Sequence, residues 1–197
     1  MKPIYKLDNL AKKRNGLLTT KDLKNENYNN YDIVSFLRSN ILEKVGKGLY
    51  YHHEYLQDTL AVIQKNNNHI IFSNETSLYL LNLTDRFPRV FSATTYSGYH
   101  VRKSDNLKLY YINKSLLDLG VIEVKTTLGN IVKSYDKERT LCDIIHNKNR
   151  IEQQIYVEAI QNYFLVSKPN LNKLAKYARA LGVSEKVNDI VTLYLKP

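Results

Sequence analysis

Cysteine is almost absent from this 197-residue chain, and its absence excludes several kinds of protein. The single cysteine, Cys142, cannot form an intramolecular disulfide and cannot build a zinc site of several cysteines. Such a composition fits a reducing compartment, so we expect a cytoplasmic protein. Long apolar runs are missing too. No stretch approaches the roughly 18 consecutive apolar residues of a membrane span, and the opening residues lack the apolar core of a secretion signal, so we expect neither secretion nor a membrane partner.

Glycine is scarce and scattered, with seven residues in the whole chain. No glycine-rich loop is placed to cradle a phosphate between a strand and a helix. The densest cluster, Gly46-Lys47-Gly48, is predicted to be a hairpin turn. Nucleotide hydrolysis therefore has no visible machinery, and we predict no cofactor.

Acidic residues are outnumbered by basic ones, 19 Asp and Glu against 29 Lys and Arg, for a net charge of +10. A surface of this sign favours phosphate-rich partners and fast, salt-sensitive association. The many Lys, Asn, Ile and Tyr residues also fit an AT-rich genome, whose proteins become basic without binding DNA. Charge alone therefore does not decide whether nucleic acid is the partner.

What the chain does contain is enough apolar sequence to fold. Its apolar fraction of 43% and charged fraction of 24% are near globular averages. The length suits two modest domains, and the polar segment 65–68 is the best candidate linker. We therefore expect one domain at residues 1–66 and a second at residues 67–197.

Three short helices are predicted in the first part of the chain. An apolar stripe predicts a first helix that ends near Asn15-Gly16. Thr19 or Thr20 can cap a second, very short helix, and Asn30 can cap a third. The first stripe consists of Ile4, Leu7, Leu10 and Ala11.

A hairpin and a closing helix complete the first domain. The segments 41–45 and 49–52 flank the glycine-rich turn and predict two paired strands. Residues 55–64 predict a helix that closes the unit. Because three helices followed by a hairpin is the winged-helix order, residues 1–66 are predicted to be a winged helix-turn-helix DNA-binding domain.

The third helix is the candidate recognition helix, because small and polar residues would form its outer face. Its inner face would carry Ile33, Val34, Phe36 and Leu37. Asparagine suits adenine and arginine suits guanine, whereas serine and tyrosine can hold a phosphate. We expect DNA contacts from Asn29, Asn30, Tyr31, Ser35 and Arg38.

Basic residues outside this helix can steady the complex on the phosphate backbone. Lys47 lies at the predicted hairpin tip between two glycines, with Lys44 and Tyr50 beside it, as expected of a wing. Any single lysine is usually a solvated surface residue, but their sum on this scaffold favours double-stranded DNA as the partner. The first two helices would contribute Lys12, Lys13, Arg14, Lys21 and Lys24.

Residues 67–197 predict a larger domain of mixed α+β structure. Strands are predicted at 69–72, 89–99, 107–112, 121–126 and 130–134, and a helix at 74–83. From residue 136 the pattern becomes helical, with helices at 138–146, 151–164, 170–181 and 184–195. The predicted fold class is α+β: an N-terminal winged helix-turn-helix and a larger mixed C-terminal domain that ends in helices.

Three blocks of the sequence resemble the AbiEi antitoxin family, the regulators of the AbiE abortive-infection toxin–antitoxin systems. They are the wing segment Leu42–Tyr50, the block Phe72–Arg86 and the block Tyr135–Ile144. The second and third blocks are fairly specific, whereas the wing would suit many regulators. The resemblance runs over most of the chain, although the helices from Ile151 on match only in general character.

The resemblance implies a fused winged-helix repressor and antitoxin. Such a protein binds inverted repeats in its own promoter and thereby represses its operon. It also neutralises a nucleotidyltransferase-like toxin without forming a stable complex with it, which is the type IV arrangement in phage defence.

Enzymatic interpretations find little support. Cys142 and His146 could share a helix face, but no third member completes a nucleophilic site, so a core cysteine is favoured. His52-His53 with Glu54 lacks a further metal ligand. Arg139 is predicted to form an ion pair at a helix start with Asp136, Glu138 or Asp143. We predict no catalytic residue and no metal site.

Two other functions stay open. The 16 tyrosines could give the C-terminal domain a surface that binds a toxin or another protein directly. A magnesium-dependent nucleic-acid enzyme is a weaker alternative, because no closely spaced acidic pair falls on a predicted strand. No heptad pattern indicates a dimer interface, so we expect a monomer that binds paired half-sites cooperatively.

Overall fold

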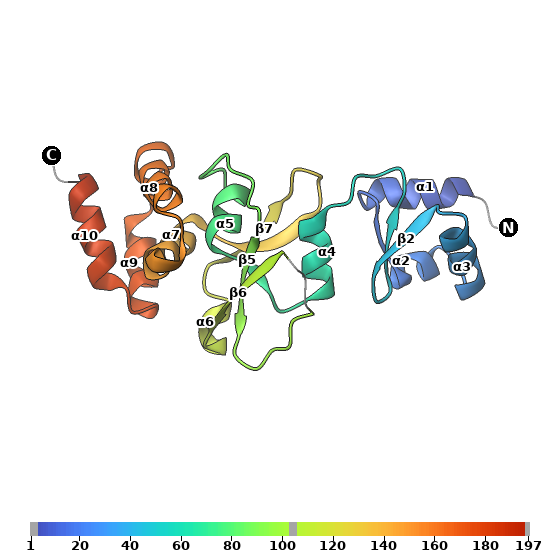
Figure 1. The fold of residues 1–197 in the computed structure, drawn as a ribbon, viewed down its shortest axis with the longest axis horizontal. Helices are drawn as coiled ribbons and strands as arrows, with labels where there is room; N and C mark the ends of the chain where they lie inside the picture. Colours follow the sequence, from blue (N-terminus) through green and yellow to red (C-terminus); the bar gives the residue numbers. More distant parts are fainter. Residues whose placement is uncertain (1–3, 103–105, 196–197) are drawn as a thin grey trace. The chain divides into compact units, whose positions relative to one another are not determined.

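The computed structural model describes residues 4–102 and 106–195, which fall into two compact units (Figure 1). The first unit takes in the chain up to Asn68 together with Lys125–Val132. The second takes in His69–Val124 and the chain from Lys133 on. The boundary expected after residue 66 thus lies two residues early, and the prediction had placed Lys125–Val132 in the C-terminal domain.

The first unit has the element order of a winged helix-turn-helix. A three-stranded antiparallel sheet with strand order β1-β3-β2 accompanies the helices. The sequence did not predict β1, which has only three residues and exists because Leu17 pairs with Tyr51 of β3. The elements are α1 Ile4–Lys13, β1 Leu17–Thr19, α2 Thr20–Asn25, α3 Asn30–Arg38, β2 Leu42–Gly46, β3 Leu49–His52 and α4 Thr59–Asn66.

Helices α2 and α3, which form the helix-turn-helix, each begin with a capping box. The Thr19 side chain accepts a hydrogen bond from the backbone N–H of Asp22, and the Asp22 carboxylate accepts one from the backbone N–H of Thr19. Asn29 and Asp32 form the same reciprocal pair at the start of α3, one residue earlier than the predicted cap at Asn30. Both boxes are local, so four consecutive residues suffice to place each helix start.

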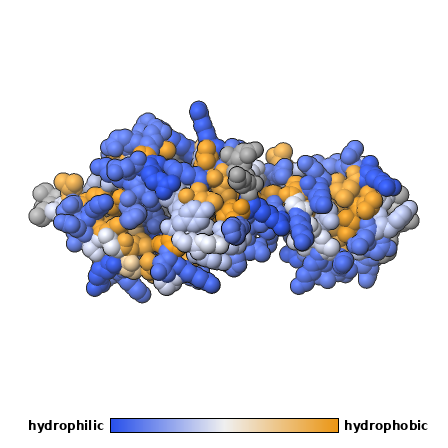
Figure 2. Space-filling model, turned by 60° about the horizontal axis from the view of Figure 1, so that its bottom comes forward, coloured by the Kyte–Doolittle hydropathy of each residue, from blue (hydrophilic) through white to orange (hydrophobic). Residues whose placement is uncertain are grey.

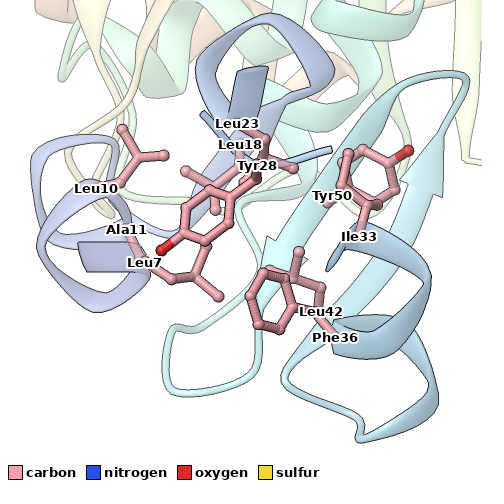
Figure 3. Packing of buried hydrophobic residues seen from close by; sticks show 10 residues of the cluster. All are labelled: Leu7, Leu10, Ala11, Leu18, Leu23, Tyr28, Ile33, Phe36, Leu42 and Tyr50. Atoms are coloured by element: carbon pink, nitrogen blue, oxygen red, sulfur yellow. The ribbon is translucent and has the colours of Figure 1, made fainter. Parts of the chain in front are cut away.

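The core of the first unit is apolar and draws on every helix of the helix-turn-helix (Figure 3). Tyr28 and Phe36 pack edge to face with their ring centroids 5.3 Å apart. Ile33 and Phe36 are buried as predicted, but Val34 is 43% exposed. The prediction placed Val34 in the core by residue type, whereas one step along a helix turns the side chain by about 100° away from Ile33.

A polar network joins the segment 125–132 to the rest of the first unit. The buried carboxylate of Asp58 caps α4 through the N–H of Ala61, and it accepts hydrogen bonds from the Thr126 hydroxyl and the Asn130 amide. The Asn15 amide donates to the carbonyl of Gly129 at 2.8 Å. These contacts connect residues 68 to 114 positions apart, so no local pattern could predict them.

The second unit is built on a mixed five-stranded sheet with strand order β6-β5-β4-β8-β7. Strands β5 and β6 run parallel, as do β4 and β8, whereas β4 and β5 are antiparallel. Its strands and first helices are β4 Ile71–Phe72, α5 Asn74–Leu80, β5 Phe91–Tyr96, β6 Leu107–Ile112, α6 Lys114–Leu117, β7 Val121–Lys125 and β8 Ile131–Tyr135.

Four helices end the chain, which confirms the predicted α+β class with a helical C-terminus. Helix α7 is central to the second unit, and all residues from Glu138 to Ile145 are buried. The predicted helix 151–164 is instead α8 followed by a π-helical turn at Asn162–Val166. The helices are α7 Lys137–His146, α8 Gln153–Gln161, α9 Leu171–Ala180 and α10 Ser184–Leu195, with a 3₁₀ turn at Lys148–Arg150. Within residues 4–102 and 106–195, no helix is both long and apolar enough to cross a bilayer.

Candidate nucleic-acid interface

The outer face of α3 carries two exposed side chains, Tyr31 and Arg38, with the half-buried Ser35 between them. Tyr31, Ser35 and Arg38 follow one another at i, i+4 and i+7, on the side of the helix away from Ile33 and Phe36. Tyr31 is 80% exposed, and Arg38 is exposed as well. The structure thus brings three of the predicted α3 residues together on a surface that the unit does not use for its own packing.

The two asparagines at the start of α3 have different tasks. The side-chain oxygen of Asn29 accepts the backbone N–H of Asp32 at 2.9 Å, so it already serves as the helix cap. Asn30 lies in the first turn with an exposed side chain. Because pairing with adenine uses both the oxygen and the nitrogen of an amide, Asn30 is better suited to it than Asn29.

The hairpin of β2 and β3 presents lysines at a tip that is held in place. Lys47 and Lys44 are exposed, and Gly48 adopts a positive φ of 66° that closes the turn. The carbonyl of Gly48 accepts the backbone N–H of Thr20 at 2.9 Å, at the first residue of α2. The wing therefore has a defined position relative to the helix-turn-helix.

Tyr50 does not belong to this surface, which corrects the prediction that it flanks Lys47 as a DNA contact. It is 9% exposed and lies in the core cluster with Ile33 (Figure 3). Its strand, β3, is the middle strand of the sheet, so all four of its residues are buried. The position of Tyr50 next to the wing turn could not reveal that it is buried. Strand β1 makes β3 the middle strand, and β1 was not predicted.

The supporting cations of the first two helices are exposed. On the face of the first unit that Figure 2 shows, hydrophilic side chains surround a smaller apolar area. Arg14, which is 57% exposed, forms an ion pair with Asp22 at 2.9 Å. Burial alone would raise the pKa of Asp22, but hydrogen bonds from Thr19 and the charge of Arg14 outweigh it and lower the pKa. The exposed lysines are Lys12, Lys13, Lys21 and Lys24.

The structure adds two residues that the sequence reasoning missed. Val34 lies between Tyr31 and Arg38 along the outer face of α3, where an apolar side chain can contact a thymine methyl group. Lys65 of α4 joins Lys13 and Arg14 in lining a cavity of about 230 Å³ in the first unit. The position of Val34, three residues after Tyr31 on the helix, could have identified it as an outer-face residue. No local sequence pattern connects Lys65 with α1.

The described residues give no support to a nucleophilic site at Cys142 or to a metal site at His52. Cys142 is fully buried, and burial raises the pKa of its thiol to about 12. His52 is buried with its Nε2 3.3 Å from an Asp8 carboxylate oxygen, and burial together with the neighbouring charge of His53 lowers its pKa. Among the residues that the structure describes, no group of three or more His, Cys, Asp and Glu side chains is placed to hold a metal ion.

Comparison with known proteins covers two different lengths of the chain. The chain resembles a solved structure, the RV2827C protein from Mycobacterium tuberculosis, with a TM-score of 0.61 and 12% sequence identity, over 96% of this chain and 80% of that one. At this identity the likeness shows the fold alone. No curated protein sequence matches the chain.

A family model matches a shorter segment, residues 5–51, which runs from α1 into β3. It is described as "Transcriptional regulator, AbiEi antitoxin". The wing block at Leu42–Tyr50 lies inside this segment, whereas the blocks Phe72–Arg86 and Tyr135–Ile144 lie outside it. Over residues 5–51 the chain is therefore similar to the AbiEi antitoxin family of transcriptional regulators, which confirms for this segment the resemblance predicted from the sequence.

Proposed function

We propose that this protein is a DNA-binding transcriptional repressor that binds inverted repeats in its own promoter and so autoregulates its operon. The observation that carries the proposal is the outward-facing stripe of Tyr31, Ser35 and Arg38 on a winged helix whose sequence matches a family of transcriptional regulators. The net charge of +10 adds a general attraction to the phosphate backbone.

The dimensions of the recognition helix suit this role. Helix α3 has nine residues, and an α-helix with its side chains is about 10–12 Å across. The major groove is about 12 Å wide and admits one such helix. In the proposed complex Asn30 and Arg38 read base edges, and Tyr31 and Ser35 hold phosphates.

The wing and the first helices then steady the complex. Lys47 and Lys44 contact phosphate or the minor groove beside the site of α3. Lys12, Arg14, Lys21 and Lys24 contact the backbone from α1 and α2. We propose a monomer that binds the two half-sites of an inverted repeat cooperatively, in the cytoplasm.

A direct test is gel-shift binding to the DNA upstream of the protein's own gene, against a scrambled duplex, at two salt concentrations. The double variant Arg38→Ala/Lys47→Ala should bind about tenfold or more weakly, and the slope of log K against log salt should fall by about one, because Lys47 contacts phosphate and Arg38 a base edge. The matched control, Lys176→Ala/Arg179→Ala, removes the same charges from exposed positions of α9 in the second unit. Unchanged affinity in a folded Arg38→Ala/Lys47→Ala variant would refute the proposed placement.

We also propose that the protein is a type IV antitoxin, acting against a nucleotidyltransferase-like toxin without a stable complex. The description of the matched family as an antitoxin supports this part. Co-expression with the toxin encoded in the same operon should restore growth, and the Arg38→Ala/Lys47→Ala variant should still protect when expressed from a foreign promoter. Co-elution of the two proteins on gel filtration would favour a direct protein-interaction module instead.

A further inference from the structure

A cavity of about 280 Å³ in the second unit has no part in the proposed DNA interface. Side chains from β6, α7 and the 3₁₀ turn after it contribute most of its polar lining. Those that carry the argument are Tyr110, Tyr111, Arg139, Asp143, His146 and Arg150.

Three of these residues end in buried polar atoms that have no hydrogen-bond partner. They are Nη2 of Arg139, Oδ2 of Asp143 and the hydroxyl of Tyr110. Over the described parts of the chain only four buried side-chain nitrogen or oxygen atoms are left without a partner, so three of the four line one cavity. Buried polar groups in folded proteins are almost always paired, which makes this concentration informative.

The other polar side-chain atoms of Arg139 and Asp143 all have hydrogen-bond partners. Nε of Arg139 donates to Oδ1 of Asp143 at 3.0 Å, and Nη1 donates to the carbonyls of Leu116 and Leu119 at 3.0 and 2.9 Å. Arg139 is completely buried, and burial raises the pKa of Asp143 to about 6 despite the adjacent guanidinium. The guanidinium also lies 4.1 Å from the centre of the Tyr135 ring, so what each charge has left is one atom without a hydrogen bond, Nη2 and Oδ2.

The two atoms without hydrogen bonds, one donor and one acceptor, indicate which kind of ligand could bind. Nη2 and Oδ2 have no hydrogen bonds and belong to side chains that are already joined through Nε and Oδ1. This arrangement suits a ligand with an acceptor and a donor side by side, as on the hydrogen-bonding edge of a nucleobase. A carboxylate ligand fits less well, because it is gripped by two guanidinium nitrogens and only Nη2 is available here.

The surroundings of the cavity suit the rest of a nucleotide. The Arg150 guanidinium lies 4.3 Å from the centre of the Tyr110 ring and its side chain is exposed, as is that of His146. Tyr111 is 56% exposed and offers an aromatic surface on which a base can stack. The volume is just below the usual range for small-molecule sites, which limits the ligand to about the size of a mononucleotide.

We propose that the second unit binds a mononucleotide, with the base edge at Arg139 and Asp143 and the phosphate at Arg150. The proposal is independent of DNA binding by the first unit, because it uses no residue of the winged helix. A regulator of this design would respond to the nucleotide pool through its C-terminal unit.

Isothermal titration of the full chain with AMP, GMP, CMP and UMP, and with inorganic phosphate, tests this. We expect one site per chain for at least one nucleotide and much weaker binding of phosphate. Tyr110→Phe removes only a hydroxyl that has no partner, so it should preserve the melting temperature and yet weaken binding severalfold. Arg150→Gln should weaken it about tenfold, the usual effect of one charge-assisted hydrogen bond.

Tyr163→Phe serves as the matched control, because its hydroxyl is already bonded to Glu138 and it lies outside the cavity. It should leave nucleotide affinity unchanged. The proposal is overturned if none of the four nucleotides binds the folded chain, if phosphate binds as tightly as they do, or if Tyr110→Phe and Arg150→Gln both bind with unaltered affinity. None of these outcomes bears on the gel-shift result for the first unit.

Discussion

Helix α3 in the first unit and helix α7 in the second have nine and ten residues, yet they are buried in opposite ways. Helix α3 buries only Ile33 and Phe36 and leaves its outer face exposed. Helix α7 buries eight consecutive residues, among them Glu138, Arg139 and Asp143. A helix that enters a groove keeps one face free of contacts within the protein, whereas a buried helix packs against its neighbours on all sides.

The cores of the two units also differ in the side chains that they bury. The first unit packs apolar side chains around Tyr28 and Phe36, so its stability follows from buried area and close packing. The second unit also packs apolar side chains, such as Leu141 and Tyr163, but it buries a guanidinium as well, and the ion pair to Asp143 confirms the predicted pairing of Arg139. Buried ion pairs cost desolvation, so we expect the two units to respond differently to core substitutions.

The largest effect is expected in the apolar core. Phe36→Ala should lower the free energy of unfolding of the first unit by about 4 kcal/mol, because it removes a buried ring and leaves a cavity. Urea unfolding followed by tyrosine fluorescence measures it, and gel shifts should show loss of DNA binding. Phe87→Ala, at a position 59% exposed in the second unit, should change the stability little. Equal losses in the two variants would contradict the assignment of Phe36 to the core.

Loss of the buried ion pair of the second unit should have a smaller effect, and a second substitution should reverse much of it. Asp143→Ala should cost about 3 kcal/mol, since it leaves the buried charge of Arg139 without its partner. We place the loss at the low end because burial has already raised the pKa of Asp143 to about 6. The double variant Arg139→Met/Asp143→Leu should recover much of the loss in urea unfolding. A double variant that is less stable than Asp143→Ala would show that the pair stabilises the unit as such.

The network around Asp58 connects the ends of the first unit. Asp58→Ala should cost about 2 kcal/mol, because it removes the cap of α4 and two hydrogen bonds to Thr126 and Asn130. Hydrogen exchange should speed up at residues 125–132. Thr59→Ala, an exposed neighbour, is the control. Unchanged exchange in Asp58→Ala would mean that other contacts hold this segment.

A smaller effect separates helix capping from DNA contact at Asn29. Asn29→Ala should cost about 1 kcal/mol by loss of the cap, whereas Asn29→Asp should keep the cap and the stability. Thermal unfolding distinguishes the two. If Asn29 also contacts DNA, Asn29→Asp should weaken the gel shift because its carboxylate repels phosphate; full affinity in that variant would limit Asn29 to capping.

The smallest effect is a pH dependence of the first unit. Burial and the neighbouring His53 lower the pKa of His52 below 6.5, so the unfolded chain takes up a proton more readily than the folded one. This contribution to stability is complete above pH 6.5 and is lost as the pH falls below it. Asp8 and Glu54 oppose the shift, and Tyr55 packs against the ring. The melting temperature should fall slightly between pH 7.5 and 5.5, less so in His52→Gln than in the control His100→Gln, which changes an exposed histidine of the second unit.

The features that could be predicted from the sequence depend on neighbouring residues. The order of helices and hairpin, the caps and the wing turn follow from patterns such as Thr19 with Asp22 and the glycines around Lys47. The same holds for the Cβ directions on α3, which put Tyr31, Ser35 and Arg38 on one face. The error at Val34 came from trusting residue type over that geometry.

What only the tertiary structure decided depends on contacts between distant residues. Pairing of Leu17 with Tyr51 creates β1 and makes β3 the middle strand, which buries Tyr50. Hydrogen bonds to Asp58 bring residues 125–132 into the first unit, and the packing around α7 leaves Arg139 with an unused nitrogen beside a cavity. Local sequence sets the backbone conformation of each short segment, but burial and hydrogen-bond satisfaction depend on which segments meet, and that is a property of the whole fold.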